Sequence, residues 1–98
     1  MAASPKVLLE NINHPGKTTP GDAAMYGAMK AAVLTVLPTS EPGMTIAQLE
    51  NAVLVHLPDD LYPSGAKAGW WTKAVQLDLE AKNVICREKV TPLRLHKV

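Results

Sequence analysis

The sequence predicts an α+β domain in which three helices are followed by a C-terminal β-hairpin. Apolar residues recur at helical spacing in three segments, and each segment has a capping residue at its start, which predicts the helices. Two short strand-like runs on either side of Thr91-Pro92 predict the hairpin. The expected boundaries are residues 20–37, 45–57 and 64–82 for the helices and 84–98 for the hairpin.

The first helix is expected to begin at the second of two Pro-Gly pairs. Thr19 suits the N-cap, Pro20 suits the first helical position, and Asp22 places a negative charge in the first turn. Residues 1–19 precede this helix and are expected to form an arm or an edge strand, with the domain itself spanning residues 20–98. One apolar stripe follows along the helix: Met25, Met29, Ala32, Val33 and Val36.

The second helix has the clearest local start signal. Thr45 and Gln48 have the spacing of a capping box, in which each side chain satisfies a main-chain N–H of the other residue. Pro58 is expected to stop this helix, because proline has no N–H for the helical hydrogen-bond ladder. Its buried stripe is expected to be Ile46, Leu49, Val53 and Leu57.

The third helix, residues 64–82, is expected to be the central one, with Ser64 as its cap. Its apolar positions cover an arc of roughly 200°, so neighbours should pack on two sides. Trp70 and Trp71 point about 100° apart and cannot share one pocket. We expect Trp71 in the core, whereas core and interface remain equal alternatives for Trp70.

Asp78 falls inside the apolar arc of that third helix. A buried carboxylate there could be catalytic, but the sequence offers no second catalytic group beside it. We therefore expect a structural acid, paired with Lys82 one helical turn later or with a tryptophan N–H.

Composition limits the possible classes of protein. Ninety-eight residues support one modest core, and no apolar run approaches the ~18 residues of a membrane span. The first residues lack the apolar region of a signal peptide, and the single cysteine excludes an internal disulfide, so cytoplasmic residence is the default expectation.

Charge is unevenly distributed along the chain. Residues 1–63 carry three lysines and six acids, a net charge of −3, whereas residues 64–98 carry seven basic residues and three acids, a net charge of +4. This asymmetry favours an anionic partner for the C-terminal third.

Signatures of catalysis and cofactor binding are missing from the sequence. The three histidines lack the spacing of a metal motif, and Gly65-x-x-x-Gly69-Trp70 lacks the Gly-Lys-Ser/Thr ending of a phosphate-binding loop. Cys86 reads as a small hydrophobic residue of the first hairpin strand. We therefore expect a protein without enzymatic activity, catalytic residues, metal or cofactor.

Two stretches resemble a known family. Leu79-Glu80-Ala81-Lys82-Asn83-Val84-Ile85-Cys86-Arg87 resembles the junction between the last helix and the hairpin of bacterial winged helix-turn-helix regulators, and Thr45-Ile46-Ala47-Gln48-Leu49 resembles the opening of their second helix. The resemblance covers residues 20–98. Gly-Ala-Lys-Ala-Gly-Trp-Trp at residues 65–71 is also similar to a small bacterial family of this fold without an assigned activity.

The resemblance implies that the third helix is a recognition helix and the hairpin a wing that touches DNA phosphates. The residues implied in nucleic-acid contact are Ser64, Lys67, Thr72, Lys73, Gln76, Arg87, Lys89 and Arg94. The first helical turn consists mostly of small residues, so we expect weak, salt-dependent binding to DNA with little base readout. The alternative is a winged helix used for contact with a protein partner or a second copy, through Trp70.

Overall fold

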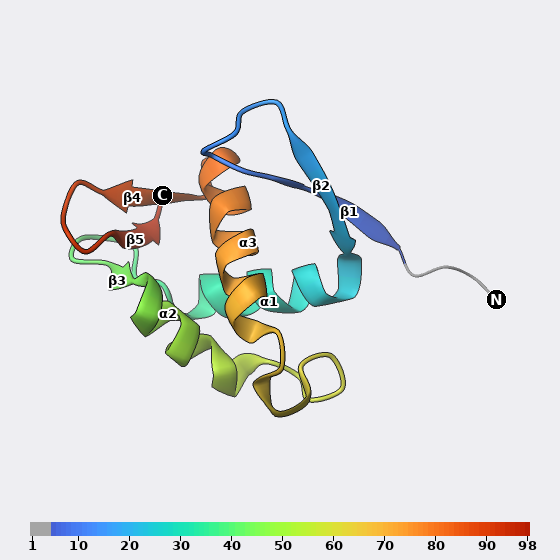
Figure 1. Cartoon of the computed structure of the whole chain (residues 1–98). Coiled ribbons are helices and arrows are strands. Elements are labelled where there is room, and N and C mark those ends of the chain that lie inside the picture. The colour runs from blue at the N-terminus through green and yellow to red at the C-terminus, as the bar shows by residue number, and fades with distance from the viewer. Residues whose placement is uncertain (1–4) are drawn as a thin grey trace.

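Two β-hairpins flank three packed helices in the computed structural model, which describes residues 5–98 (Figure 1). The elements in chain order are β1 (Lys6–Glu10), β2 (Thr18–Asp22), α1 (Ala23–Val36), β3 (Met44–Thr45), α2 (Ile46–Val53), α3 (Ala68–Ala81), β4 (Ile85–Glu88) and β5 (Arg94–Lys97). Two 3-10 turns, Leu54–His56 and Pro63–Gly65, connect α2 to α3. The predicted α+β class is confirmed, as is the order of three helices before a hairpin. None of the described helices is long and apolar enough to cross a membrane.

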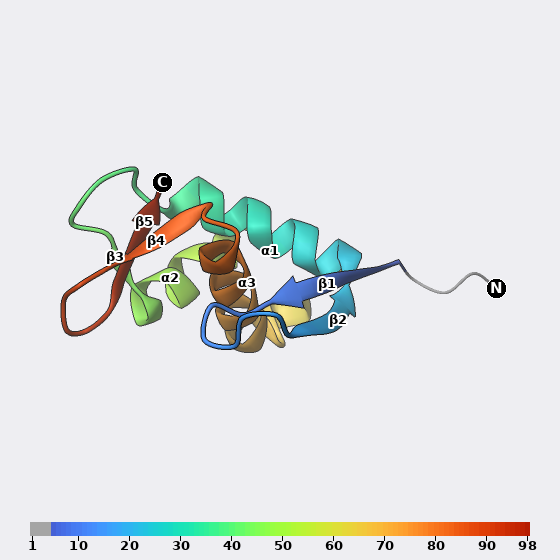
Figure 2. The ribbon, with the colours of Figure 1, turned by 90° about the horizontal axis from the view of Figure 1, so that it is seen from above.

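The strands form two separate antiparallel sheets. β1 pairs with β2 from Lys6 opposite Asp22 to Glu10 opposite Thr18. The second sheet has the order β3-β5-β4, so the two-residue strand β3 adds to the predicted hairpin of β4 and β5. Seen from above, the two sheets lie at opposite ends of the molecule with α3 between them (Figure 2). Residues 1–4 of the expected N-terminal arm lie outside the described range.

The first helix starts later than predicted. Thr19 and Pro20 belong to β2, where Pro20 lies opposite Leu8, and Asp22 is the N-cap whose carboxylate accepts a hydrogen bond from the Met25 N–H at 2.9 Å. The assignment of Thr19 as cap and Pro20 as first helical residue was therefore wrong. A proline is tolerated there because it lies on a two-stranded sheet whose edges are free of further strands.

The second helix begins as predicted. Thr45 and Gln48 form the complete capping box, with distances of 3.2 Å from the Gln48 N–H to the Thr45 hydroxyl and 3.0 Å from the Thr45 N–H to the Gln48 side chain. The regular helix ends at Val53 and continues as a 3-10 turn up to His56. Leu57 is the C-cap of this turn, and Pro58 comes next, in agreement with its predicted role as a stop.

The third helix also starts later than predicted. Ser64 has a φ of 52° and lies in a 3-10 turn, and Lys67, the N-cap residue of α3, has a φ of 65°. Left-handed residues cannot continue a right-handed helix, so Ser64 is not its cap and the helix begins at Ala68. The helix ends at Ala81, one residue before the predicted boundary, and Asn83 follows with a φ of 60°.

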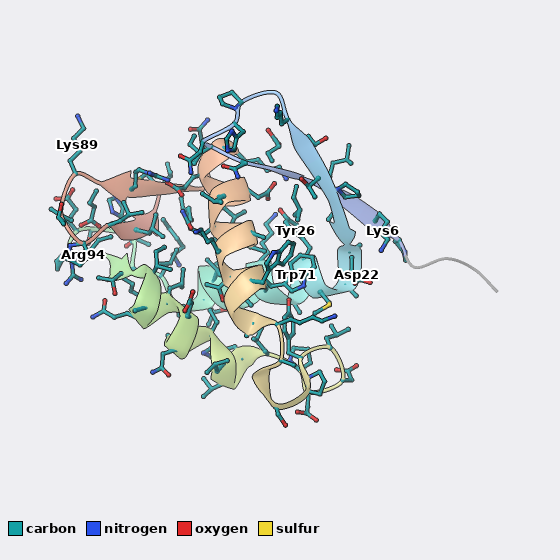
Figure 3. The ribbon with its side chains drawn as sticks, viewed as in Figure 1. Lys6, Asp22, Tyr26, Trp71, Lys89 and Arg94 are labelled. Carbon is teal, nitrogen blue, oxygen red and sulfur yellow. The ribbon has the colours of Figure 1, made fainter. Side chains whose placement is uncertain are left out.

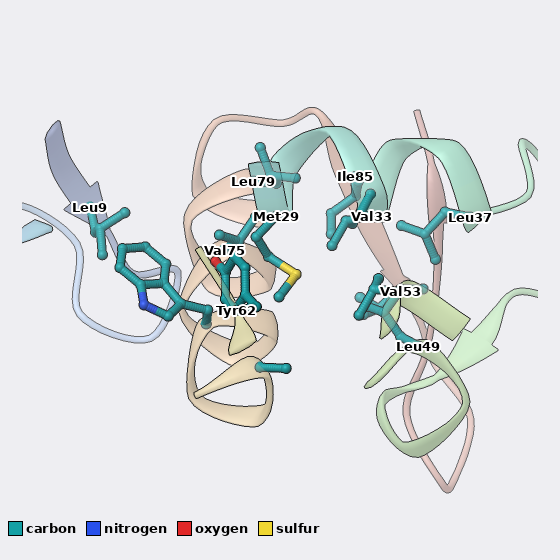
Figure 4. Close-up of a cluster of buried hydrophobic side chains, with 14 residues drawn as sticks. Leu9, Met29, Val33, Leu37, Leu49, Val53, Tyr62, Val75, Leu79 and Ile85 are labelled. Carbon is teal, nitrogen blue, oxygen red and sulfur yellow. The ribbon is translucent and has the colours of Figure 1, made fainter. Parts of the chain in front are cut away.

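The core surrounds α3, which contacts α1, α2, β1 and β4 and is the central helix as predicted. Trp71 is 5% exposed and packs under the N-terminal hairpin, where a Cβ added to Gly21 would lie 3.0 Å from the Trp71 ring. Figure 4 shows the remaining core side chains meeting between the helices. They include Leu9, Met29, Val33, Leu37, Leu49, Val53, Tyr62, Val75, Leu79 and Ile85.

A buried carboxylate fastens the N-terminal hairpin to the helices. Asp78 of α3 accepts hydrogen bonds from the Glu10 main-chain N–H at 2.9 Å, the Tyr26 hydroxyl at 2.6 Å and the Lys82 ammonium at 2.7 Å. The main-chain N–H of Ile12 donates to the Leu77 carbonyl 3.3 Å away. Asp78 thus ties β1, α1 and α3 together, and the predicted pairing with Lys82 is confirmed.

The two tryptophans should differ in their contribution to stability. We expect Trp71→Ala to lower the free energy of unfolding by about 3–5 kcal/mol, as for other core aromatic truncations. Trp70→Ala should cost clearly less, because 59% of Trp70 is exposed. Urea denaturation of both variants measures the difference, and equal losses would contradict the assignment of the two faces.

Asp78→Asn should lower the free energy of unfolding by about 2–3 kcal/mol, because three donors lose a charged acceptor. The substitution should also loosen the hairpin locally, so amide hydrogen exchange should accelerate at Glu10 and Ile12. Glu10→Gln is the matched control: it removes only the exposed 3.9 Å contact with Lys82 and should cost less than about 1 kcal/mol. Unchanged exchange at Glu10 in Asp78→Asn would show that the carboxylate does not hold the hairpin.

Candidate functional site: a groove beside Trp70

A groove of about 360 Å³ lies between the N-terminal hairpin and the exposed side of α3. The hairpin forms one wall and α3 the other, so the two walls come from segments far apart in the chain. The volume is within the range of about 300–1,000 Å³ that small-molecule sites occupy. The lining residues are Leu9, Glu10, Asn11, His14, Lys17, Thr19, Gly69, Trp70, Lys73, Ala74 and Leu77.

Helical spacing explains the α3 wall. Trp70, Lys73, Ala74 and Leu77 follow one another at i, i+3, i+4 and i+7, which places them on one face of the helix. The opposite face packs into the core. Gly69 starts the wall, and a Cβ there would meet no atom within 4 Å, so the absence of a side chain leaves the groove open at this end.

Trp70 is the most prominent group of the groove. It is 59% exposed, and the prediction that it is more exposed than Trp71 is confirmed. The two rings meet edge to face, with centroids 5.1 Å apart and planes at 81°. Because Trp71 is fixed in the core, this contact holds the exposed ring in one orientation.

The charges around the groove are mainly positive. Lys17 and Lys73 carry a positive charge, Glu10 carries a negative one, and His14 is the remaining titratable group of the lining. A carboxylate or another anion next to an apolar group therefore matches the groove better than a cation does.

The Asp78 contacts behind the hairpin wall also shift the pKa values of their neighbours. Burial, the hydrogen bond to Asp78 and its negative charge raise the pKa of the Tyr26 hydroxyl. Burial lowers the pKa of Lys82, but the hydrogen bond and charge of Asp78 outweigh it, so this pKa is also raised. Both donors therefore keep their protons at neutral pH.

Two of the predicted nucleic-acid contacts are buried. Thr72 is enclosed in the core and donates its hydroxyl hydrogen bond to the Ala68 carbonyl at 2.7 Å. Gln76 is also enclosed and donates to the carboxylate of Glu80. The prediction that these side chains reach a DNA groove was wrong, because both satisfy their polar groups within α3 and face the core.

The predicted cations occupy different environments. Arg87 pairs with the buried Glu80, and the hydrogen bond to that carboxylate raises the pKa of Arg87. Arg94 donates to the Gly43 carbonyl at 2.7 Å. Lys89 is exposed and, with Arg94, lies at the outer end of the C-terminal hairpin (Figure 3).

The remaining predicted residues lie at the start of α3. Ser64 and Lys67 are exposed in the turn before the helix, and Lys73 is exposed on the groove wall. The structure thus divides the predicted residues that are not buried in the core between the start and groove side of α3 and the C-terminal hairpin on its other side (Figure 1).

Sequence reasoning missed the hairpin wall of the groove. Leu9, His14 and Lys17 belong to a segment that was expected to be an arm or an edge strand. The available signal was Pro15-Gly16, a turn between a run of apolar residues and two threonines, which is typical of a hairpin loop. Within residues 5–98, no three His, Cys, Asp or Glu side chains gather as a metal site would require.

Comparison with known proteins identifies the family of the chain. No curated protein and no solved structure matched it. One family model matches residues 6–95, which include both groove walls and the C-terminal hairpin up to Leu95. The chain therefore belongs to the family described as Family of unknown function (DUF6958).

Proposed function

We propose that this protein is a winged-helix-like binding module without enzymatic activity, and that it docks a segment of a partner protein in the groove beside Trp70. The occupant is an apolar side chain with an acidic residue next to it. The observation that carries the proposal is the exposed, oriented indole ring of Trp70 at a groove of about 360 Å³.

Anchoring is the first argument for this function. Tryptophan is enriched among the residues that dominate binding energy at protein interfaces. An exposed indole costs solvation energy unless a partner covers it, and Leu9, Ala74 and Leu77 extend the apolar surface beside it. An apolar side chain of about the size of leucine or phenylalanine would bury the ring and fill the groove.

Charge is the second argument. Lys17 and Lys73 lie on opposite walls, one on the hairpin and one on α3, so a carboxylate between them gains from both. Desolvated charge pairs at an interface contribute mainly to partner choice. An acidic residue beside the apolar anchor is therefore the feature that this groove would select.

The winged-helix resemblance supports the fold part of the proposal, through three helices followed by the hairpin of β4 and β5. It gives less support to a recognition helix. Thr72 and Gln76 face the core, and the loop after β1 bonds to the Leu77 carbonyl on the groove side of α3. A duplex would have to displace this hairpin to contact the whole exposed face of the helix.

The test is a selection of short random peptides displayed on phage against the folded wild-type protein. We expect the enriched peptides to combine Asp or Glu with Leu, Phe or Trp. Trp70→Ala should weaken their affinity at least about tenfold, a loss of about 1.4 kcal/mol that is typical of an interface anchor. Replacing Lys17 and Lys73 by glutamine should weaken it further and remove most of its dependence on salt.

A pair of glycine variants separates blocking of the groove from damage to the fold. Gly69→Leu adds a side chain where the groove is open, whereas Gly27→Leu adds the same side chain on α1, where a Cβ also meets no atom within 4 Å. We expect Gly69→Leu to abolish peptide binding and Gly27→Leu to leave it unchanged. Peptides that bind Trp70→Ala and Gly69→Leu as well as wild type would refute the groove as the docking site.

DNA binding and self-association are the competing outcomes, and each has its own measurement. Lys67, Lys73 and Lys89 remain exposed, so phosphate contact by all three predicts a slope near −3 for log affinity against log salt. Lys73→Ala should then flatten the slope by about one unit. Duplex binding with this behaviour would replace the peptide proposal, as would a dimer in sedimentation that Trp70→Ala dissociates.

A further inference from the structure

The outer face of the C-terminal hairpin brings together a thiol, an imidazole and a carboxylate. Cys86 of β4 lies directly opposite His96 of β5, and their Sγ and Nε2 atoms are 3.1 Å apart. The other ring nitrogen, Nδ1, lies 2.7 Å from Oε2 of Glu88. Strand alternation turns Ile85 and Leu95 into the core, so these three polar side chains share the opposite face.

A neighbouring loop fixes the carboxylate. The Glu88 side chain is 4% exposed and accepts a 2.7 Å hydrogen bond from the Gly43 main-chain N–H. The loop can approach this closely only through glycine, because a Cβ at residue 43 would lie 1.9 Å from the Leu95 carbonyl oxygen. The same oxygen of Glu88, Oε2, thus contacts both the Gly43 N–H and the His96 ring.

The contact with Glu88 favours one tautomer of the His96 ring. A carboxylate accepts hydrogen bonds, so the Glu88 contact favours the imidazole tautomer that carries its proton on Nδ1. The lone pair of Nε2 then faces the Cys86 thiol. Nucleophile, base and orienting carboxylate lie in sequence within hydrogen-bond distance, which is the geometry of an activated nucleophile.

We propose that Cys86 is a reactive thiol that exchanges with small disulfides. His96 Nε2 takes the proton of the Cys86 thiol, and the thiolate attacks one sulfur of the disulfide. A new S–S bond forms between Cys86 and that sulfur as the old S–S bond breaks. The second sulfur leaves as a thiolate and takes the proton back from the imidazolium.

Disulfide exchange fits this site better than acyl transfer does. Acyl transfer needs, besides the nucleophile and base, N–H donors directed at a developing oxyanion. Exchange needs only a thiolate and a disulfide. Because Cys86 is the only cysteine of the sequence, the mixed disulfide cannot be resolved within the chain and persists until an external thiol removes it.

The charged groups on this face of the sheet are Glu88 and Arg94, which lie opposite each other across the strands. Arg94 donates to the Gly43 carbonyl on the same loop that holds Glu88. The Glu80–Arg87 ion pair lies on the other face of β4. Besides Cys86 itself, Glu88 is therefore the ionisable side chain in contact with the His96 ring.

The test measures the rate of mixed-disulfide formation with 5,5′-dithiobis(2-nitrobenzoate) at about pH 8 and about pH 6. In the chain unfolded by guanidinium, the rate should fall about 75-fold between these values, as expected for an ordinary thiol. In the folded protein we expect a fall of less than about tenfold, because His96 supplies the thiolate at the lower pH. Mass spectrometry should show one adduct, located on Cys86.

Three variants complete the experiment. His96→Asn and Glu88→Gln should restore a steep fall close to that of the unfolded chain. Glu88→Gln keeps an acceptor for Gly43, and circular dichroism checks that both variants fold. His56→Asn is the control: it replaces an exposed histidine in the 3-10 turn after α2, and this variant should behave like wild type. A native protein that does not react, that shows the full 75-fold fall, or that is unaffected by Glu88→Gln would each overturn the proposal.

Discussion

The attachment of the N-terminal hairpin by Asp78 is the interaction on which the rest of this structure depends. One buried carboxylate receives donors from β1, α1 and α3, so each of its hydrogen bonds comes from a different part of the fold. Burial of a charge is costly unless hydrogen bonds and a counter-charge compensate it, and here both are present. Without this carboxylate the Glu10 N–H would lose its acceptor, and fewer polar contacts would hold the hairpin wall of the groove against α3.

Local signals in the sequence predicted the parts of the fold that have local causes. Thr45 and Gln48, which cap α2, are only three residues apart, so the sequence pattern that predicts the cap also supplies both partners of its hydrogen bonds. The exposure of Trp70 and burial of Trp71 follow from the 100° between neighbouring helical positions. By contrast, Thr19 and Pro20 read as a helix start, and only pairing with β1 makes them a strand. The Pro15-Gly16 turn is a local sign of a hairpin, but it does not specify which residues pair.

The candidate sites were predicted less well, for a related reason. Polar residue types on α3 suggested a solvent-facing sector, but Thr72 and Gln76 satisfy their hydrogen bonds within the helix and can therefore be buried at little cost. The contact of Cys86 with His96 depends on the register of the hairpin, which the turn geometry decides. Trp70 was named as a possible interface residue and is exposed at the groove, whereas Lys17 and Leu9 on the facing wall lay in a segment whose fold was not predicted.

The hydrogen bond between Glu10 and Asp78 joins residues 68 positions apart, so the chain closes a loop that contains both of the first two helices. Closing so long a loop costs entropy that only the finished contacts repay. During synthesis, β1 leaves the ribosome long before α3 exists, so the groove cannot form until α3 has been made. A molecule that occupies this groove therefore bridges two segments that are distant in the chain, and its binding energy opposes their separation.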